Sequence, residues 1–279
     1  MEIQKGLSIT MDYLIYRKGL KIMKGKFTEL KALNIFALIA MVTVNVLAQV
    51  LPLGGMTTAE ISDLYPTLLT PIGLSFSIWS LIYIAMGWFV IQQVIASDDS
   101  ATKRVGGLFA ITCALNIAWI FSWHYQVMIL AVVSIAALWV ALLMIDNRLE
   151  NEKWHLRSGF TIYFAWITAA TAIQIFSYLS AMLPIRYGSP LSIGITVAAM
   201  LILTVFALEK MLLEKNILFG LTIGWVSLGI FLSQIKAGPE NSFMLIKIVS
   251  IISLSLILLS CVWAFTKMRN KQKMIEADI

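Results

Sequence analysis

The sequence predicts an all-α polytopic membrane protein with about eight transmembrane helices. Hydrophobic residues make up 59% of the 279-residue chain and charged residues only 13%, whereas about a quarter of the residues in a soluble domain are charged. The apolar residues form long segments, each able to supply the roughly 20 helical residues that cross a hydrocarbon core. The sequence lacks the shorter, alternating segments that are typical of a membrane β-barrel.

Eight such segments follow one another, separated by hydrophilic or proline-containing connections. The connections SDDSATKR at 97–104, DNRLENEKWHLR at 146–157 and EKMLLEK at 209–215 are too polar to remain in hydrocarbon, so each ends a span. We expect spans at Ala32–Leu51, Ile72–Ile95, Val105–His124, Val127–Ile145, Gly159–Met182, Leu191–Leu208, Asn216–Ile235 and Phe243–Thr266.

Lys and Arg are distributed unevenly between the two sides of this bundle. Eighteen fall in the N-terminal segment, the C-terminal tail and the loops on the same side, whereas the opposite loops hold only Arg186 and Lys236. The positive-inside rule therefore places both termini in the cytoplasm, and we expect a multi-pass protein of the plasma membrane. The net charge of +6 then faces anionic lipid and does not indicate a nucleic-acid partner.

All six prolines fall on the opposite, outer side, where they stiffen the loops. The longest outer connection, Pro52–Pro71, contains TTAEISDLY. In it, Thr57 and Glu60 have the spacing of a capping box, which predicts a short surface helix. Long loops of this kind are often functional, so the segment is either a lid over a binding site or an ordinary connector.

Aromatic rings and carboxamides from four spans fall at similar depths. The stretch Pro71–Trp88 places Trp79 and Tyr83 on one helix face because they are four residues apart. Carboxamides buried in lipid need hydrogen-bond partners, which a neighbouring helix or the polar edge of a ligand can supply. We therefore expect a ligand pocket between the first, second, third and fifth spans, formed by Asn45, Trp79, Tyr83, Asn116, Trp119, Tyr163, Trp166, Ala170 and Gln174. For any single Trp, packing between helices is the favoured interpretation, and it is the combination of residues that favours a pocket.

Several other residues bear on mechanism. Every Asp and Glu lies in a loop, in a tail or at a helix end such as Asp146, which argues against a proton-driven pump. No phosphate-binding loop is present, which argues against ATP hydrolysis by this chain. His124 is either an axial haem ligand or, more commonly for such a position, an interfacial residue. Lys247 is read as a snorkelling side chain, with a ligand counter-ion as the alternative.

The spacing of the cysteines and glycines says less about function than the residues above. Cys113 and Cys261 both lie in apolar runs without metal-ligand spacing, so we expect no metal site. Gly220 and Gly224 have the GxxxG spacing that lets two helices approach closely, either within the chain or in a homodimer.

Three sequence motifs occur in a recognisable order. IWSLIYIAMGW follows Pro71, CALNIAW occupies 113–119, and IYFAWITAATAIQ occupies 162–174. These stretches resemble the VWxxLYxxMG, LALNxxW and PYLAWxxFATxLN motifs of the TspO/MBR family, the translocator proteins or tryptophan-rich sensory proteins. The chain departs from that pattern at Ile162, at Gln174 and in the first outer loop, which lacks the family's KPxWxPP.

The resemblance implies a domain division and a ligand class. Residues 32–182 would form the five-helix membrane domain, and residues 183–266 would add three transmembrane helices, as in a longer bacterial-type variant. A basic cytoplasmic segment (residues 1–31) and a basic cytoplasmic tail (residues 267–279) would flank them. The implied ligands are tetrapyrroles such as porphyrin or haem, or sterol-like lipids, with sensing, transport or porphyrin breakdown as the roles; no resident cofactor is required.

The leading hypothesis is a receptor or carrier that binds a hydrophobic planar ligand in the predicted pocket. Its expected partners are membrane lipid, a hydrophobic small molecule and a second copy of the chain. The alternative is a permease subunit driven by a separate ATPase. An enzyme acting on its bound porphyrin is less favoured, because the sequence shows no nucleophile and base in a catalytic arrangement.

Overall fold

The computed structural model describes residues 29–51, 53–95, 100–152, 154–238, 240 and 242–277. All regular structure in these residues is helical, as the composition predicts. Most of the expected N-terminal segment, residues 1–31, lies outside the described residues.

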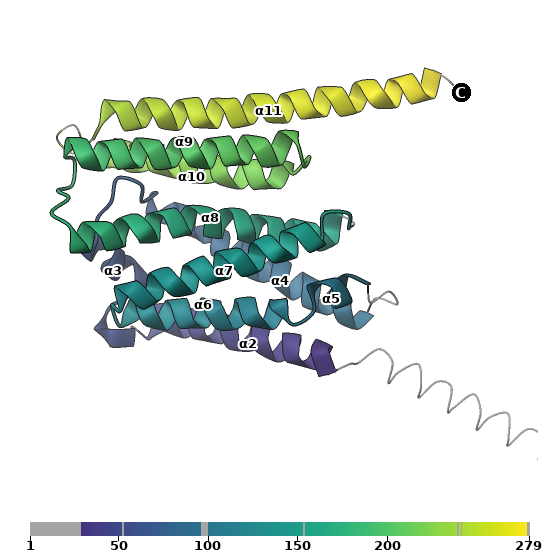
Figure 1. The fold of residues 1–279 in the computed structure, drawn as a ribbon, viewed down its shortest axis with the longest axis horizontal. Coiled ribbons are helices and arrows are strands. Elements are labelled where there is room, and N and C mark those ends of the chain that lie inside the picture. The colour runs from purple at the N-terminus through teal and green to yellow at the C-terminus, as the bar shows by residue number, and fades with distance from the viewer. Residues whose placement is uncertain are drawn as a thin grey trace, which may run out of the picture.

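Long helices run side by side through the whole molecule (Figure 1). Seven helical stretches of the described chain are long and apolar enough to cross a membrane, and α6 is a further apolar helix of 17 residues. Each expected span overlaps one of these helices, so the chain is a multi-pass membrane protein with the predicted fold class. The helices are α2 (Glu29–Val50), α4 (Ile78–Ile95), α6 (Leu108–His124), α7 (Met128–Arg148), α8 (Trp154–Met182), α9 (Pro190–Leu212), α10 (Ile217–Lys236) and α11 (Met244–Ala277).

The helix α8 joins the two parts of the bundle. It contacts α4 and α7 on one side and α10 on the other, while α9, α10 and α11 lie together above it in Figure 1. Among the seven long spans α8 is the most deeply buried. A helix that is apolar all round has no polar face to turn outward, and the buried residues of α8 point in every direction, including Phe160, Tyr163, Phe164, Ala165, Trp166 and Ile167.

The second and third spans begin differently from the prediction. The second is not helical from Ile72: a 3₁₀ helix, η2 (Gly73–Ser77), precedes α4. In the third, a short helix α5 (Ser100–Val105) is separated from α6 by Gly106, which has a φ of 57°. Glycine adopts this left-handed conformation without steric cost, so the chain turns there and α6 starts three residues later than expected.

The two ends of the bundle are named here after their short helices. The α3 end carries α3 (Thr58–Leu64), at the left of Figure 1, and the α5 end carries α5, at the right. The first residues of α2 and the last residues of α11 both lie at the α5 end. The helix α11 continues to Ala277, well past the predicted end of its span at Thr266.

The predicted capping box opens α3. The Thr57 backbone N–H donates to Glu60 Oε2 over 2.7 Å, and the Glu60 backbone N–H donates to Thr57 Oγ1 over 3.3 Å. The hydrogen bonds from Thr57 hold the pKa of the Glu60 carboxyl below its usual value, because they favour the charged form. The short surface helix predicted in the first long loop is therefore confirmed.

Candidate functional site: an aromatic and carboxamide cluster

Trp79 lies at the centre of a group of five aromatic rings, called here the aromatic cluster. Its ring stacks on Tyr83 and on Trp119, with centroid distances of 5.7 and 6.2 Å. It meets Tyr163 and Trp166 edge to face at 5.9 and 6.3 Å. These are the offset and perpendicular geometries that aromatic pairs prefer. The cluster therefore joins α4, α6 and α8 at the first turn of α4.

A row of hydrogen-bonded side chains runs beside the aromatic cluster. Asn45 Nδ2 donates to Asn116 Oδ1 over 2.7 Å and also to the Met41 carbonyl over 2.8 Å. Asn116 Nδ2 in turn donates to the Tyr163 hydroxyl over 3.2 Å. Because lipid offers no partners to these groups, the bonds hold α2, α6 and α8 in one register.

Two donors in this region have no acceptor. Trp119 Nε1 donates to Gln174 Oε1 over 3.1 Å, but within the described chain Gln174 Nε2 and Trp166 Nε1 are buried without a hydrogen-bond partner. Trp166 is 1% exposed and Gln174 is 4% exposed. An unsatisfied buried donor costs about 1–3 kcal/mol. The helix α8 therefore presents two N–H groups that an acceptor would stabilise.

The structure thus places the nine predicted residues in one region. Eight are linked by ring contacts or hydrogen bonds, and Ala170 lies between Trp166 and Gln174, one turn from each, packed against the core. The rings of the aromatic cluster pack directly on one another. A separate groove of about 310 Å³ lies between α4, α8 and α10 and is lined by none of these nine residues.

The first long loop is fastened to the end of α6 at the α3 end. His124 is buried, and its ring nitrogens lie 3.0 Å from Thr58 Oγ1 and 3.1 Å from the Leu53 carbonyl. Trp123 Nε1 donates to the Thr58 carbonyl over 3.4 Å. With both nitrogens in hydrogen-bond contact, His124 serves here to anchor the loop. No group of three or more His, Cys, Asp or Glu suited to a metal is found in the part of the chain that the structure describes.

Comparison with known protein families shows to which family the chain belongs. The sequence model of the TSPO-like protein family matches residues 31–263, which is most of the chain. The chain belongs to the TSPO-like protein family. Searches of curated proteins and of solved structures find no match. The family match extends through α9 and α10 into α11, so it takes in the three helices beyond residue 182.

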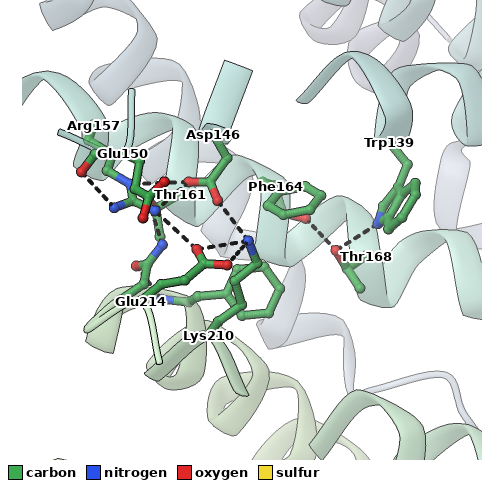
Figure 2. Close-up of polar contacts among 11 residues, drawn as sticks. Trp139, Asp146, Glu150, Arg157, Thr161, Phe164, Thr168, Lys210 and Glu214 are labelled. Carbon is green, nitrogen blue, oxygen red and sulfur yellow. Dashed lines mark hydrogen bonds and ion pairs between the residues drawn. The ribbon is translucent and has the colours of Figure 1, made fainter. Parts of the chain in front are cut away.

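This TSPO-like chain also contains a buried charge cluster that sequence reasoning missed (Figure 2). Lys210 Nζ lies 3.2 Å from Asp146 Oδ2 and 2.7 Å from Glu214 Oε1. Arg157 lies 3.2 Å from Asp146 and 3.4 Å from Glu214. The four residues join the ends of α7 and α9 to the start of α8. The Lys210–Glu214 spacing of four residues was the available signal, since it predicts a helix that continues past Leu208.

The glycines of α10 make contacts inside the TSPO-like chain. A Cβ added at Gly224 would lie 3.4 Å from Ile257 and 3.5 Å from Leu254, both on α11. One added at Gly229 would lie 2.8 Å from Pro71 Cβ and would also meet Ser75. Gly224 of the GxxxG pair therefore packs against α11 of the same chain, and a closer approach is made by Gly229, which lies outside the pair. The homodimer remains a prediction.

Proposed function

We propose that this TSPO-like protein is a membrane receptor or carrier for a hydrophobic planar ligand bound at the aromatic cluster. The observation that carries the proposal is the pair of unsatisfied buried donors, Trp166 Nε1 and Gln174 Nε2, beside the rings of the aromatic cluster. A flat ligand with a hydrogen-bond acceptor at its edge would contact the rings and satisfy these donors. A tetrapyrrole, with its planar ring and polar edge, meets this description, and so does a lipid that carries a carbonyl group.

The ligand would enter by separating rings that now touch. Trp79 stands in the first turn of α4 and carries four of the ring contacts, so displacement of its ring would open the cluster. The Trp119–Gln174 hydrogen bond fixes the far side. For orientation we propose the α5 end as the cytoplasmic end in a plasma membrane, since the Lys and Arg excess lies there.

A fluorescence titration with protoporphyrin tests the proposal. Trp166→Phe keeps an aromatic ring but removes the indole donor, and Gln174→Leu removes the carboxamide. We expect each to weaken binding about tenfold, the loss of one hydrogen bond to a buried acceptor. Trp139→Phe is the matched control, because Trp139 donates to Thr168 outside the aromatic cluster. Unchanged affinity in both cluster variants would exclude this site.

A further inference from the structure

The groove beside α10 is separate from the aromatic cluster. It is lined by Ser77, Ile78 and Leu81 at the start of the second span, Ile162 on α8, and Leu218, Leu221, Thr222 and Trp225 on α10. The four α10 residues have the spacing of one helix face. The groove therefore runs along α10 from its first turn, over a length of roughly 10 Å at 1.5 Å per residue.

The polar groups of the groove are already satisfied, apart from the exposed Ser77 hydroxyl. Thr222 Oγ1 donates to the Leu218 carbonyl over 2.9 Å. Trp225 Nε1 donates to the Ser75 carbonyl over 3.0 Å. A polar guest would lose its hydration here without gaining partners, so the lining selects an apolar guest.

The groove opens sideways to the membrane. Leu81 is 50% exposed and Leu221 is 42% exposed, and both belong to helices that are apolar enough to lie in hydrocarbon. An apolar groove that lies along a transmembrane helix and opens to the hydrocarbon can hold an acyl chain along the membrane normal.

A cation lies beyond the α5 end of the groove. Lys215 is exposed and lies in the connection between α9 and α10, three residues before Leu218 in the sequence. Its side chain forms no ion pair with the described part of the chain. At the membrane surface, such a side chain attracts anionic lipid headgroups.

We propose that the groove between α4, α8 and α10 binds one acyl chain of an anionic phospholipid, whose headgroup lies near Lys215. The apolar lining holds the chain, and the cation selects the headgroup charge. Because the site uses α10 and shares no lining residue with the aromatic cluster, the proposal does not depend on the proposed ligand function.

Native mass spectrometry of the full chain in mild detergent tests this proposal. The protein is offered phosphatidylglycerol or phosphatidylcholine with identical acyl chains, and bound lipids are counted. We expect about one phosphatidylglycerol per chain, lowered about tenfold by Leu221→Trp, because that side chain fills the groove and removes the apolar contact. Leu130→Trp is the matched control, since Leu130 is an exposed leucine on α7.

A separate comparison of variants and lipids tests whether the site selects an anionic headgroup. Lys215→Gln should lower phosphatidylglycerol binding about fivefold and leave phosphatidylcholine binding unchanged. A second variant that fills the groove, Ile162→Trp, tests the same site. Thermal unfolding of each variant shows whether it keeps its fold. Equal lipid retention by the wild type, Leu221→Trp and Ile162→Trp would overturn the groove as the site. Equal affinity of the wild type for both lipids, or retention of a free fatty acid in their place, would overturn the anionic phospholipid.

Discussion

Trp225 on α10 donates a hydrogen bond from Nε1 to the main-chain carbonyl of Ser75, 3.0 Å away and 150 residues earlier in the chain. Nearby, the Ile72 N–H donates to the Gly229 carbonyl over 3.0 Å. Backbone that is not α-helical is tolerated at membrane depth only where protein supplies the missing partners. The helix α10 supplies them here, and it thereby fixes the 3₁₀ turn from which Trp79 enters the aromatic cluster.

Replacing the donor of that bond should loosen the start of α4. Trp225→Phe keeps a ring but removes the indole donor, so the Ser75 carbonyl keeps only the Ile78 N–H, and we expect a loss of about 1 kcal/mol of stability. Thermal unfolding in detergent measures the change. Trp263→Phe is the control because Trp263 is half exposed on α11. If both variants unfolded at the same temperature as the wild type, Trp225 would have no anchoring role.

The contact at Gly229 should not tolerate a larger residue. A Cβ there would press on Pro71 and Ser75, so Gly229→Ala forces α10 and η2 apart, and overpacking of this kind costs about 1–3 kcal/mol. Gly194→Ala is the matched control, since a Cβ at Gly194 on α9 meets nothing within 4 Å. That variant should be neutral or stabilised by up to about 1 kcal/mol. The opposite order of unfolding temperatures would contradict the close approach.

The buried charge cluster should behave as a coupled unit. Lys210→Met leaves Asp146, which is fully buried, without one of its two cations, and removing one partner of a buried ion pair costs about 3–5 kcal/mol. The double variant Asp146→Asn/Lys210→Met should recover part of this loss, and a double-mutant cycle on unfolding free energies measures the coupling. Lys236→Met, at an exposed position, is the control. Strictly additive effects would show that the four charges act separately.

The stability that the capping box contributes to α3 should decrease as the pH falls. Because the pKa of Glu60 is lowered in the folded protein, its contribution is complete above the usual carboxyl pKa. It is lost as the pH falls through the lowered value. An NMR titration of the Glu60 carboxyl should give a midpoint below 4.5, and Thr57→Ala should move the midpoint back up. A wild-type midpoint at or above 4.5 would contradict the hydrogen bonds.

Local sequence was sufficient for the spans and for the membership of the aromatic cluster. Apolar length is a property of each segment alone, and a spacing of four residues puts Trp79 and Tyr83 on one helix face whatever surrounds them. The rings of the second, third and fifth spans, which were expected at similar depths, contact one another. Which groups in the cluster lack partners could not be predicted, because the match of donors to acceptors depends on side-chain positions from several helices.

Features that depend on distant residues were missed. Pro71 predicts the beginning of a helix, but the 3₁₀ turn that follows it is set by contacts with α10. Asp146 and Lys210 looked like loop and helix-end residues, since their burial depends on how α7, α8 and α9 meet. Local hydropathy cannot distinguish a buried helix end from an exposed one.

The most direct test of ligand binding at the aromatic cluster is ¹⁹F NMR of protein labelled with 5-fluorotryptophan and titrated with protoporphyrin. Resonances are assigned by single Trp→Phe variants. The proposed site predicts that the signals of Trp79, Trp119 and Trp166 shift together and saturate, while those of Trp139 and Trp263 stay unchanged. Saturable shifts confined to Trp139 and Trp263, or no saturable shift in any of the five, would contradict the site.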